Sequence, residues 1–201
     1  MSGQDSTDGP TWLYHYDGAK LHKIAPASLS GSSSGLRPYD LTGLLWVAQV
    51  EPLNVAGYRA ALFFSGVNEH GKVGLWMSQG YNGTTREITT PTPQGGNSNT
   101  SVYPFNLTAL PNDNGYLYFT AYNTYINGFP SARALFAYDP EQNQITKIIP
   151  NASANQLQLD PQFNTDWEGD GFFNQLTVTA LNNDLYFSAE GGSGNESVPN
   201  L

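Results

Sequence analysis

The sequence predicts an all-β protein built from four-stranded antiparallel sheets, and three observations lead to this fold class. Aromatic residues make up 13% of the chain, with 12 Tyr and 10 Phe, and such side chains suit the pleated surface of a strand. Short apolar runs alternate with clusters of Asn, Asp and Gly, which are turn residues. No longer window has the periodicity of an amphipathic helix. Strands joined by tight turns are therefore expected throughout.

The same order of apolar segments occurs in near-copies along the chain. One copy covers residues 37–91 and another covers residues 102–150. In the first copy, strands are expected at residues 43–50, 60–65, 73–78 and 85–90. In the second, strands are expected at residues 104–110, 116–121, 132–138 and 144–149. Each copy is predicted to form its own antiparallel sheet.

Two further segments match only half of the repeated unit. Residues 11–26 match its second half, and residues 172–201 match its first half, so that Leu62, Leu117 and Leu185 occupy equivalent positions. Four strands in each repeated unit are typical of a β-propeller blade. The sequence thus predicts a propeller-like region over residues 11–201, preceded by a polar segment, residues 1–10, that is expected to be disordered. A jelly roll or β-sandwich with ordinary hairpins is the alternative.

About three blades are fewer than the roughly 4–8 that close a propeller ring. The predicted array is therefore incomplete or is completed by another chain. Two explanations stay open, a homodimer in which each chain contributes three blades and a fragment of a longer repeat protein. We favour the fragment, because residues 191–201 are expected to lead into a further outer strand.

The pattern resembles the bacterial E-L-W-x-x-D-G-T repeats, also called hyalin-like repeats, of large surface and secreted proteins. The residues that carry the resemblance are Leu75, Trp76, Gly80, Gly83 and Thr84, together with the Leu-Tyr-Phe runs at 117–119 and 185–187 and the Gly-Ser loop at 31–34. Gly74 and Gln79 stand where that repeat has Glu and Asp. The resemblance implies a propeller-like fold and an extracellular or cell-surface location. It implies no shared set of catalytic residues.

The distribution of charge argues against two classes of partner. The formal net charge is −9, and residues 101–201 hold ten acidic residues against two basic ones. Such a surface repels the phosphates of nucleic acids and of anionic membranes. No apolar stretch is long enough to span a bilayer, and residues 1–10 have none of the features of a signal peptide. The chain contains no cysteine, which excludes disulfides and thiolate metal sites.

The strongest local signal for a metal site is the acidic run Asp166, Glu168 and Asp170, followed by Gly171. Oxygen ligands at alternate positions before a glycine resemble the start of a calcium-binding loop. Thr177 stands where that loop has its bidentate Glu, so any calcium is expected to bind weakly. A solvated acidic turn is the alternative. No other cofactor is expected.

Histidines and aromatic residues supply the remaining candidates. His15 and His22 lie in neighbouring predicted strands, where they could face each other as a metal pair or as simple cross-strand neighbours. Glu69 and His70 lie in a predicted loop, where His70 is a candidate general base. Aromatic residues in predicted loops could bind a sugar or a protein, or pack between blades. These are Tyr81, Tyr103, Tyr122, Tyr125, Phe129 and Trp167.

These observations favour a non-catalytic binding or scaffold module that contacts a protein or a glycan through its loops. Catalysis needs titratable groups that converge in a cavity, and the sequence offers few. A propeller-type glycan hydrolase or lyase is the first alternative, and it requires two carboxylates about 5–9.5 Å apart. A purely structural repeat is the second alternative.

Overall fold

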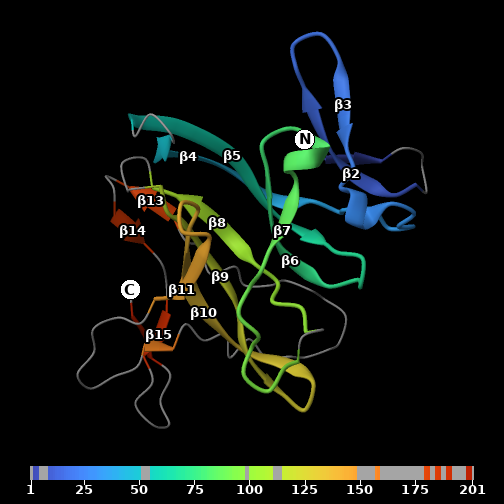
Figure 1. Ribbon diagram of the computed structural model, residues 1–201. Coiled ribbons are helices and arrows are strands. Elements are labelled where there is room, and N and C mark those ends of the chain that lie inside the picture. The colour runs from blue at the N-terminus through green and yellow to red at the C-terminus, as the bar shows by residue number, and fades with distance from the viewer. Residues whose placement is uncertain are drawn as a thin grey trace.

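The computed structural model describes residues 2–4, 9–50, 55–97, 100–110, 115–148, 157–158, 179–181, 184–186, 189–191 and 198–200. Antiparallel strands dominate these residues, and two short 3-10 helices, η1 (Ala27–Leu29) and η2 (Asn82–Thr84), lie in connections. Figure 1 shows successive sheets arranged side by side along the chain, from the blue N-terminal strands to the yellow and orange ones. The all-β prediction is therefore confirmed. Among the described residues, no helix is long and apolar enough to cross a membrane.

Two four-stranded meanders form the centre of the molecule. The first sheet contains β4 (Tyr39–Val50), β5 (Val55–Val67), β6 (Val73–Ser78) and β7 (Arg86–Ile88), in that spatial order. The second sheet contains β8 (Phe105–Ala109), β9 (Leu117–Ile126), β10 (Phe129–Asp139) and β11 (Gln144–Lys147), also in order. These are the two sheets expected from the two near-copies in the sequence.

Smaller sheets lie on either side of these two along the chain. The N-terminal sheet contains β1 (Ser2–Gln4), β2 (Thr11–Tyr16) and β3 (Leu21–Ile24). The prediction of disorder over residues 1–10 therefore fails at Ser2–Gln4, because these residues pair with β2. The C-terminal hairpin contains β13 (Thr179–Leu181) and β14 (Asp184–Tyr186). A last sheet contains β12 (Leu157–Gln158), β15 (Ala189–Gly191) and β16 (Val198–Asn200).

The outer two strands of the successive sheets pair in one shared register. Leu13 lies opposite Ile24 in the N-terminal sheet, and Leu75 lies opposite Ile88 in the first sheet. In the second sheet, the carbonyl of Leu135 accepts a hydrogen bond of 2.8 Å from the backbone N–H of Ile148. All three leucines are buried. The pairs β2–β3, β6–β7 and β10–β11 therefore correspond to one another.

The inner two strands also share a register. Thr42 pairs with Phe63 in the first sheet, Thr108 pairs with Tyr118 in the second, and Thr179 pairs with Tyr186 in the C-terminal hairpin. The residue after each Thr pairs with a leucine, and these leucines are Leu62, Leu117 and Leu185. The equivalence that the sequence predicted for these three leucines is confirmed by the pairing.

A backbone irregularity recurs at the start of the inner strand. The register shifts between Tyr39 and Thr42 in β4, and it shifts between Phe105 and Thr108 in β8. At these shifts, Asp40 has φ of 53° and Asn106 has φ of 56°. Asp and Asn tolerate this left-handed conformation better than most residues with a side chain. The residue types at the two positions therefore suit the same bulge.

Neighbouring sheets are joined by equivalent backbone hydrogen bonds. Arg37 donates to the carbonyl of Thr11 at 2.9 Å, and Tyr103 donates to the carbonyl of Val73 at 3.4 Å. Thr11 begins β2 and Val73 begins β6, and these two strands correspond in register through Leu13 and Leu75. The first sheet is therefore attached to the N-terminal sheet as the second sheet is attached to the first.

Two hydrophobic clusters fill the spaces between sheets. One joins the first and second sheets and contains Phe63, Leu75, Leu117, Phe119 and Tyr138 among its fully buried members. The other joins the N-terminal and first sheets through Leu13, Leu36, Phe64 and Trp76. Burial of a large apolar side chain contributes roughly 1.5–3 kcal/mol, so these clusters are the main stabilising contacts between sheets.

Strands β9 and β10 extend further than the sequence pattern predicted. Strand β9 continues to Ile126 and β10 begins at Phe129, and Asn127 and Gly128 form the turn between them. Both turn residues have positive φ, 52° and 84°, as a two-residue hairpin turn requires. The Asn-Gly pair was the sequence signal that predicts such a hairpin, and our expectation of a loop over this segment was wrong.

Candidate functional site

The most distinctive side-chain arrangement described in the structure surrounds Arg133 of β10. The guanidinium carbon of Arg133 lies 4.3 Å from the ring centre of Phe105 and 4.3 Å from that of Tyr122. Arg133 pairs with Tyr122 across β9 and β10, and Phe105 begins the adjacent strand β8. Strand pairing thus brings one cation into contact with two aromatic faces, an attractive arrangement.

Further tyrosines continue this cluster. The ring centres of Tyr103 and Tyr122 are 5.9 Å apart, and those of Tyr122 and Tyr125 are 6.1 Å apart, in edge-to-face contacts. The Tyr125 hydroxyl donates to the carbonyl of Ser101 at 2.6 Å. On the other side, the ring of Tyr39 lies 5.6 Å from that of Phe105. All these rings are only partly buried.

The cluster raises the pKa of two of its tyrosines. Burial raises the pKa of Tyr39 to about 12, against the opposing effects of a hydrogen bond with Ser65 and the charge of Arg133. Burial also raises the pKa of Tyr125 to about 12, and the neighbouring Tyr103 and Tyr122 add to this effect. Both phenols are therefore neutral hydrogen-bonding groups at physiological pH. They are not poised for proton transfer.

The β9–β10 hairpin ends in two exposed apolar side chains, Ile126 (57% exposed) and Phe129 (55% exposed). The loop that follows the first sheet supports this hairpin through its backbone. The N–H of Gln94 donates to the carbonyl of Asn123 at 2.8 Å, and the carbonyl of Gln94 accepts from the N–H of Tyr125 at 2.7 Å. The tip is thus an apolar projection on a hydrogen-bonded base. We call Tyr103, Phe105, Tyr122, Tyr125, Ile126, Phe129 and Arg133 together the aromatic surface.

A polar cavity of about 590 Å³ contains the candidate base His70. Its carboxylates are Glu69, which lies 3.4 Å from the His70 ring nitrogen, and Glu87. The side-chain amide of Asn68 donates to both oxygens of Glu87, at 3.1 Å and 3.0 Å. The side-chain oxygen of Asn68 also accepts from the backbone of His70, at 3.0 Å. Through these hydrogen bonds, Asn68 and Glu87 hold the loop that carries His70 in place.

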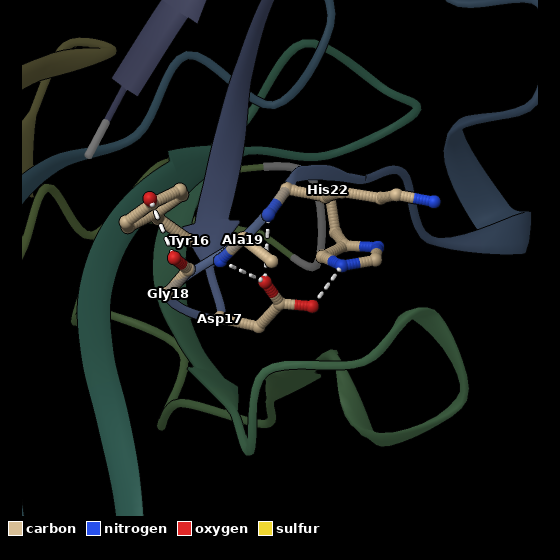
Figure 2. A network of polar contacts seen from close by, with 6 residues as sticks. Tyr16, Asp17, Gly18, Ala19 and His22 are labelled. Carbon is tan, nitrogen blue, oxygen red and sulfur yellow. Dashed lines mark hydrogen bonds and ion pairs between the residues drawn. The ribbon is translucent and has the colours of Figure 1, made fainter.

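His15 and His22 do face each other across β2 and β3, with ring centres 6.2 Å apart. His22 forms part of the turn between β2 and β3, because its Nε2 lies 2.7 Å from a carboxylate oxygen of Asp17 (Figure 2). The other Asp17 oxygen accepts from the backbone N–H groups of Lys20 and Ala19. These bonds, that from Lys20 first, hold the pKa of Asp17 well below its usual range. The histidine pair is thus part of a structured hairpin turn.

The described part of the chain contains no group of three or more His, Cys, Asp or Glu side chains placed to hold a metal ion. The predicted calcium ligands Asp166, Glu168 and Asp170 lie outside the described residues, as does Trp167. The calcium site therefore stays a prediction.

Of the candidate aromatic residues, the structure brings together Tyr103, Tyr122 and Tyr125 and places Phe129 at the tip of the same hairpin. Tyr81 lies elsewhere, 67% exposed and against His15. Sequence reasoning missed Arg133, Phe105 and Tyr39. Arg133 is a lone basic residue directly before the apolar run Ala134-Leu135-Phe136, but nothing in the sequence showed which rings would face it.

Comparison with known proteins gives no relatives for this chain. No protein-family model matches it, and neither a curated protein nor a solved structure matches it.

Proposed function

We propose that the chain is a propeller-type binding module. Three successive sheets share the register of their outer strands, and the hydrogen bonds that attach one sheet to the next are equivalent at both junctions. An array in which each sheet relates to the next in the same way continues around an axis, which is the geometry of propeller blades. The hyalin-like resemblance and the surface or secreted location belong to the same proposal.

The aromatic surface is the part of this module that contacts a protein or glycan. It is assembled by rigid strands, and it presents exposed apolar side chains beside tyrosine hydroxyls and one cation. Aromatic residues and Arg are the residue types that dominate recognition surfaces, because they combine apolar area with hydrogen-bonding groups. The exposed pair Ile126 and Phe129, on a hairpin supported by Gln94, is the single observation that carries this proposal.

A glycan hydrolase or lyase is the rival function, and the polar cavity around His70 is where it would act. In that cavity Glu87 is held by two hydrogen bonds from Asn68. A carboxylate held in this way supports a structural role in the loop more than that of a mobile general acid. A purely structural repeat would leave the aromatic surface without a ligand.

The proposal is tested by screening the chain against a panel of soluble glycans and a displayed peptide library. We expect one of the two panels to give a ligand, and the double change Ile126→Ser and Phe129→Ser to weaken its binding at least tenfold. Tyr81→Ser is the matched control, because Tyr81 is exposed and lies outside the aromatic surface. Failure of both panels would overturn the proposal, and cleavage of a glycan that Glu87→Gln abolishes would establish the rival.

A further inference from the structure

An apolar cavity of about 640 Å³ lies between the N-terminal sheet and the first sheet. Its walls include Leu13 and Ile24 from β2 and β3, and Leu45, Ala60 and Leu62 from β4 and β5. Leu45 is 60% exposed although it lies in the middle of a strand. We call this cavity, with the neighbouring edge of β2, the apolar groove.

The groove lies where the other sheets have their inner strands. In the first and second sheets, the outer strands β6 and β10 are each preceded by two inner strands that pack toward the neighbouring sheet. The N-terminal sheet has β2 and β3 as its outer strands, and on the inner side of β2 the described residues provide only β1. The groove thus has the position of an inner hairpin.

Strand β1 covers only part of the β2 edge. Its Ser2 lies opposite Leu13, as Ser65 lies opposite Leu75 and Thr120 lies opposite Leu135. β1 therefore has the position of the end of a second strand. In the first and second sheets, the second strand continues past this point for at least three more pairs. The corresponding positions on β2 extend to His15 and Tyr16, beyond β1.

The C-terminal hairpin has the register of the inner strands that would fill this position. Its Thr179–Tyr186 and Ala180–Leu185 pairs repeat those of β8 with β9 and of β4 with β5. In its own chain, β13 packs beside β8, as β8 packs beside β4. Figure 1 shows the red β13–β14 hairpin and the blue β2–β3 hairpin on opposite sides of the molecule. The hairpin is therefore placed to meet the groove of another molecule.

We propose that the apolar groove binds the β13–β14 hairpin of a second copy of this chain, and that the reciprocal contact closes a ring of two chains. By the register of the second sheet, where Leu117 pairs with Tyr138 and Tyr118 with Ala137, Leu185 of one copy lies opposite Tyr16 of the other and Tyr186 lies opposite His15. The added strand ends opposite His15 and β1 begins opposite Leu13, so that only the position of Tyr14 lies between them. β14 and β1 together then make one second strand along β2.

This pairing has two sources of stability. The strand edge of β2 gains backbone hydrogen bonds, as in other cases of strand addition between chains. The side chains of the groove, including the exposed Leu45, become covered by the hairpin. When each copy places its hairpin in the groove of the other, the two contacts are related by a twofold axis, and no groove or hairpin is left for a third chain.

The first test is the mass of the full chain and of two variants by sedimentation velocity. We expect the wild type to sediment at twice the chain mass and Leu45→Glu to sediment as a monomer, because a carboxylate in the groove opposes burial. Leu21→Glu is the matched control, since Leu21 is 55% exposed on a neighbouring strand and does not line the groove, and it should stay dimeric. Circular dichroism of both variants checks that they are folded. A monomeric wild type, or open-ended polymers, would overturn the inference.

The second test uses the absence of cysteine from the chain. Opposed residues of antiparallel strands have Cα atoms about 4.5–5.5 Å apart, within the range that a disulfide spans. A tagged chain carrying only Tyr186→Cys is mixed with an untagged chain carrying only His15→Cys and oxidised. We expect a disulfide between the two kinds of chain, and at least tenfold less when Lys20→Cys, in the turn, replaces His15→Cys. Equal yields would contradict the proposed register.

The inference rests on the propeller part of the proposed function, and the two can fail separately. The change Leu45→Glu is expected to remove the dimer without a direct effect on the aromatic surface, because Leu45 is not one of the residues of that surface. A chain that is monomeric but binds a ligand through Phe129 would overturn the closure and leave the binding function standing.

Discussion

The backbone N–H of Leu107 donates to the carboxylate of Asp40 at 3.0 Å, which joins the inner strand of the second sheet to that of the first. The Thr42 hydroxyl donates to the carbonyl of the same Leu107, at 2.5 Å. One residue of β8 is thus held through both of its backbone groups by β4. Asp40 occupies the bulge position that Asn106 occupies one sheet later.

The pH dependence of stability should differ between the wild type and Asp40→Asn. Burial raises the pKa of Asp40, and the backbone N–H groups of Leu107 and Asn106 oppose this. An acid with a raised folded-state pKa stabilises the fold less as pH rises above the ordinary carboxyl value of about 3.9. We therefore expect the melting temperature of Asp40→Asn to gain on that of the wild type between pH 3.5 and pH 7. A difference that is constant across this range would contradict the assignment.

Gly35 should tolerate no side chain. Its φ is 68°, and an added Cβ would lie 2.5 Å from the carbonyl oxygen of Thr11. The left-handed conformation alone costs about 1–2 kcal/mol for a non-glycine residue, so Gly35→Ala should lose more than this in urea unfolding. Gly31→Ala has the same conformational cost without a close neighbour, and Gly83→Ala has neither. Losses of unfolding free energy that do not decrease in the order Gly35, Gly31, Gly83 would contradict this account of Gly35.

The buried hydroxyl of Ser65 should contribute to the stability of the fold. It is fully buried and donates to the carbonyl of Pro104 at 2.6 Å, between the first and second sheets. Removal of one partner of a buried hydrogen bond costs about 1–3 kcal/mol. Ser65→Ala should therefore lose this amount in chemical denaturation, whereas Ser30→Ala at an exposed position should be neutral. Equal stability of the two variants would count against the bond.

The contribution of Asp17 should disappear in acid. Its pKa is held below the usual range, chiefly by the backbone N–H of Lys20 and then by that of Ala19 and by His22. A carboxyl with a lowered folded-state pKa stabilises the fold above its unfolded value and loses this effect as pH falls below about 3.9. Asp17→Asn should therefore melt below the wild type at pH 7, with a gap that narrows toward pH 2.5. A gap that widens in acid would refute this account.

Two tyrosines near Arg133, Tyr39 and Tyr125, should ionise only at high pH. Burial raises the pKa of Tyr39 and of Tyr125 to about 12, above the usual value of about 10. Because the unfolded chain ionises first, the stability that these groups contribute is full below pH 10 and decreases as pH rises toward 12. Ultraviolet titration should resolve a late phase that Tyr39→Phe and Tyr125→Phe each reduce. A late phase that neither change reduces would contradict this account.

The sequence by itself determined the all-β class, the strand order and the repeated register. Leu62, Leu117 and Leu185 could be aligned before any pairing was known, because the turn residues and apolar runs around each one are local. Strand alternation and turn chemistry depend on neighbours in the chain, so a periodic sequence predicts them. The Asn127-Gly128 turn was also predictable in this way, although our expectation of a loop there was wrong.

Only the tertiary structure decided the two surfaces on which the two proposals rest. Arg133 meets Phe105, 28 residues before it in the chain, because the bulge at Asn106 and the pairing of β8, β9 and β10 set their relative positions. The apolar groove likewise brings together Leu13 and Ala60, which lie far apart in the chain and belong to different sheets. Contacts between distant segments depend on how the sheets pack against one another. Hydrophobic alternation predicts a buried face, but it does not predict which other face covers it.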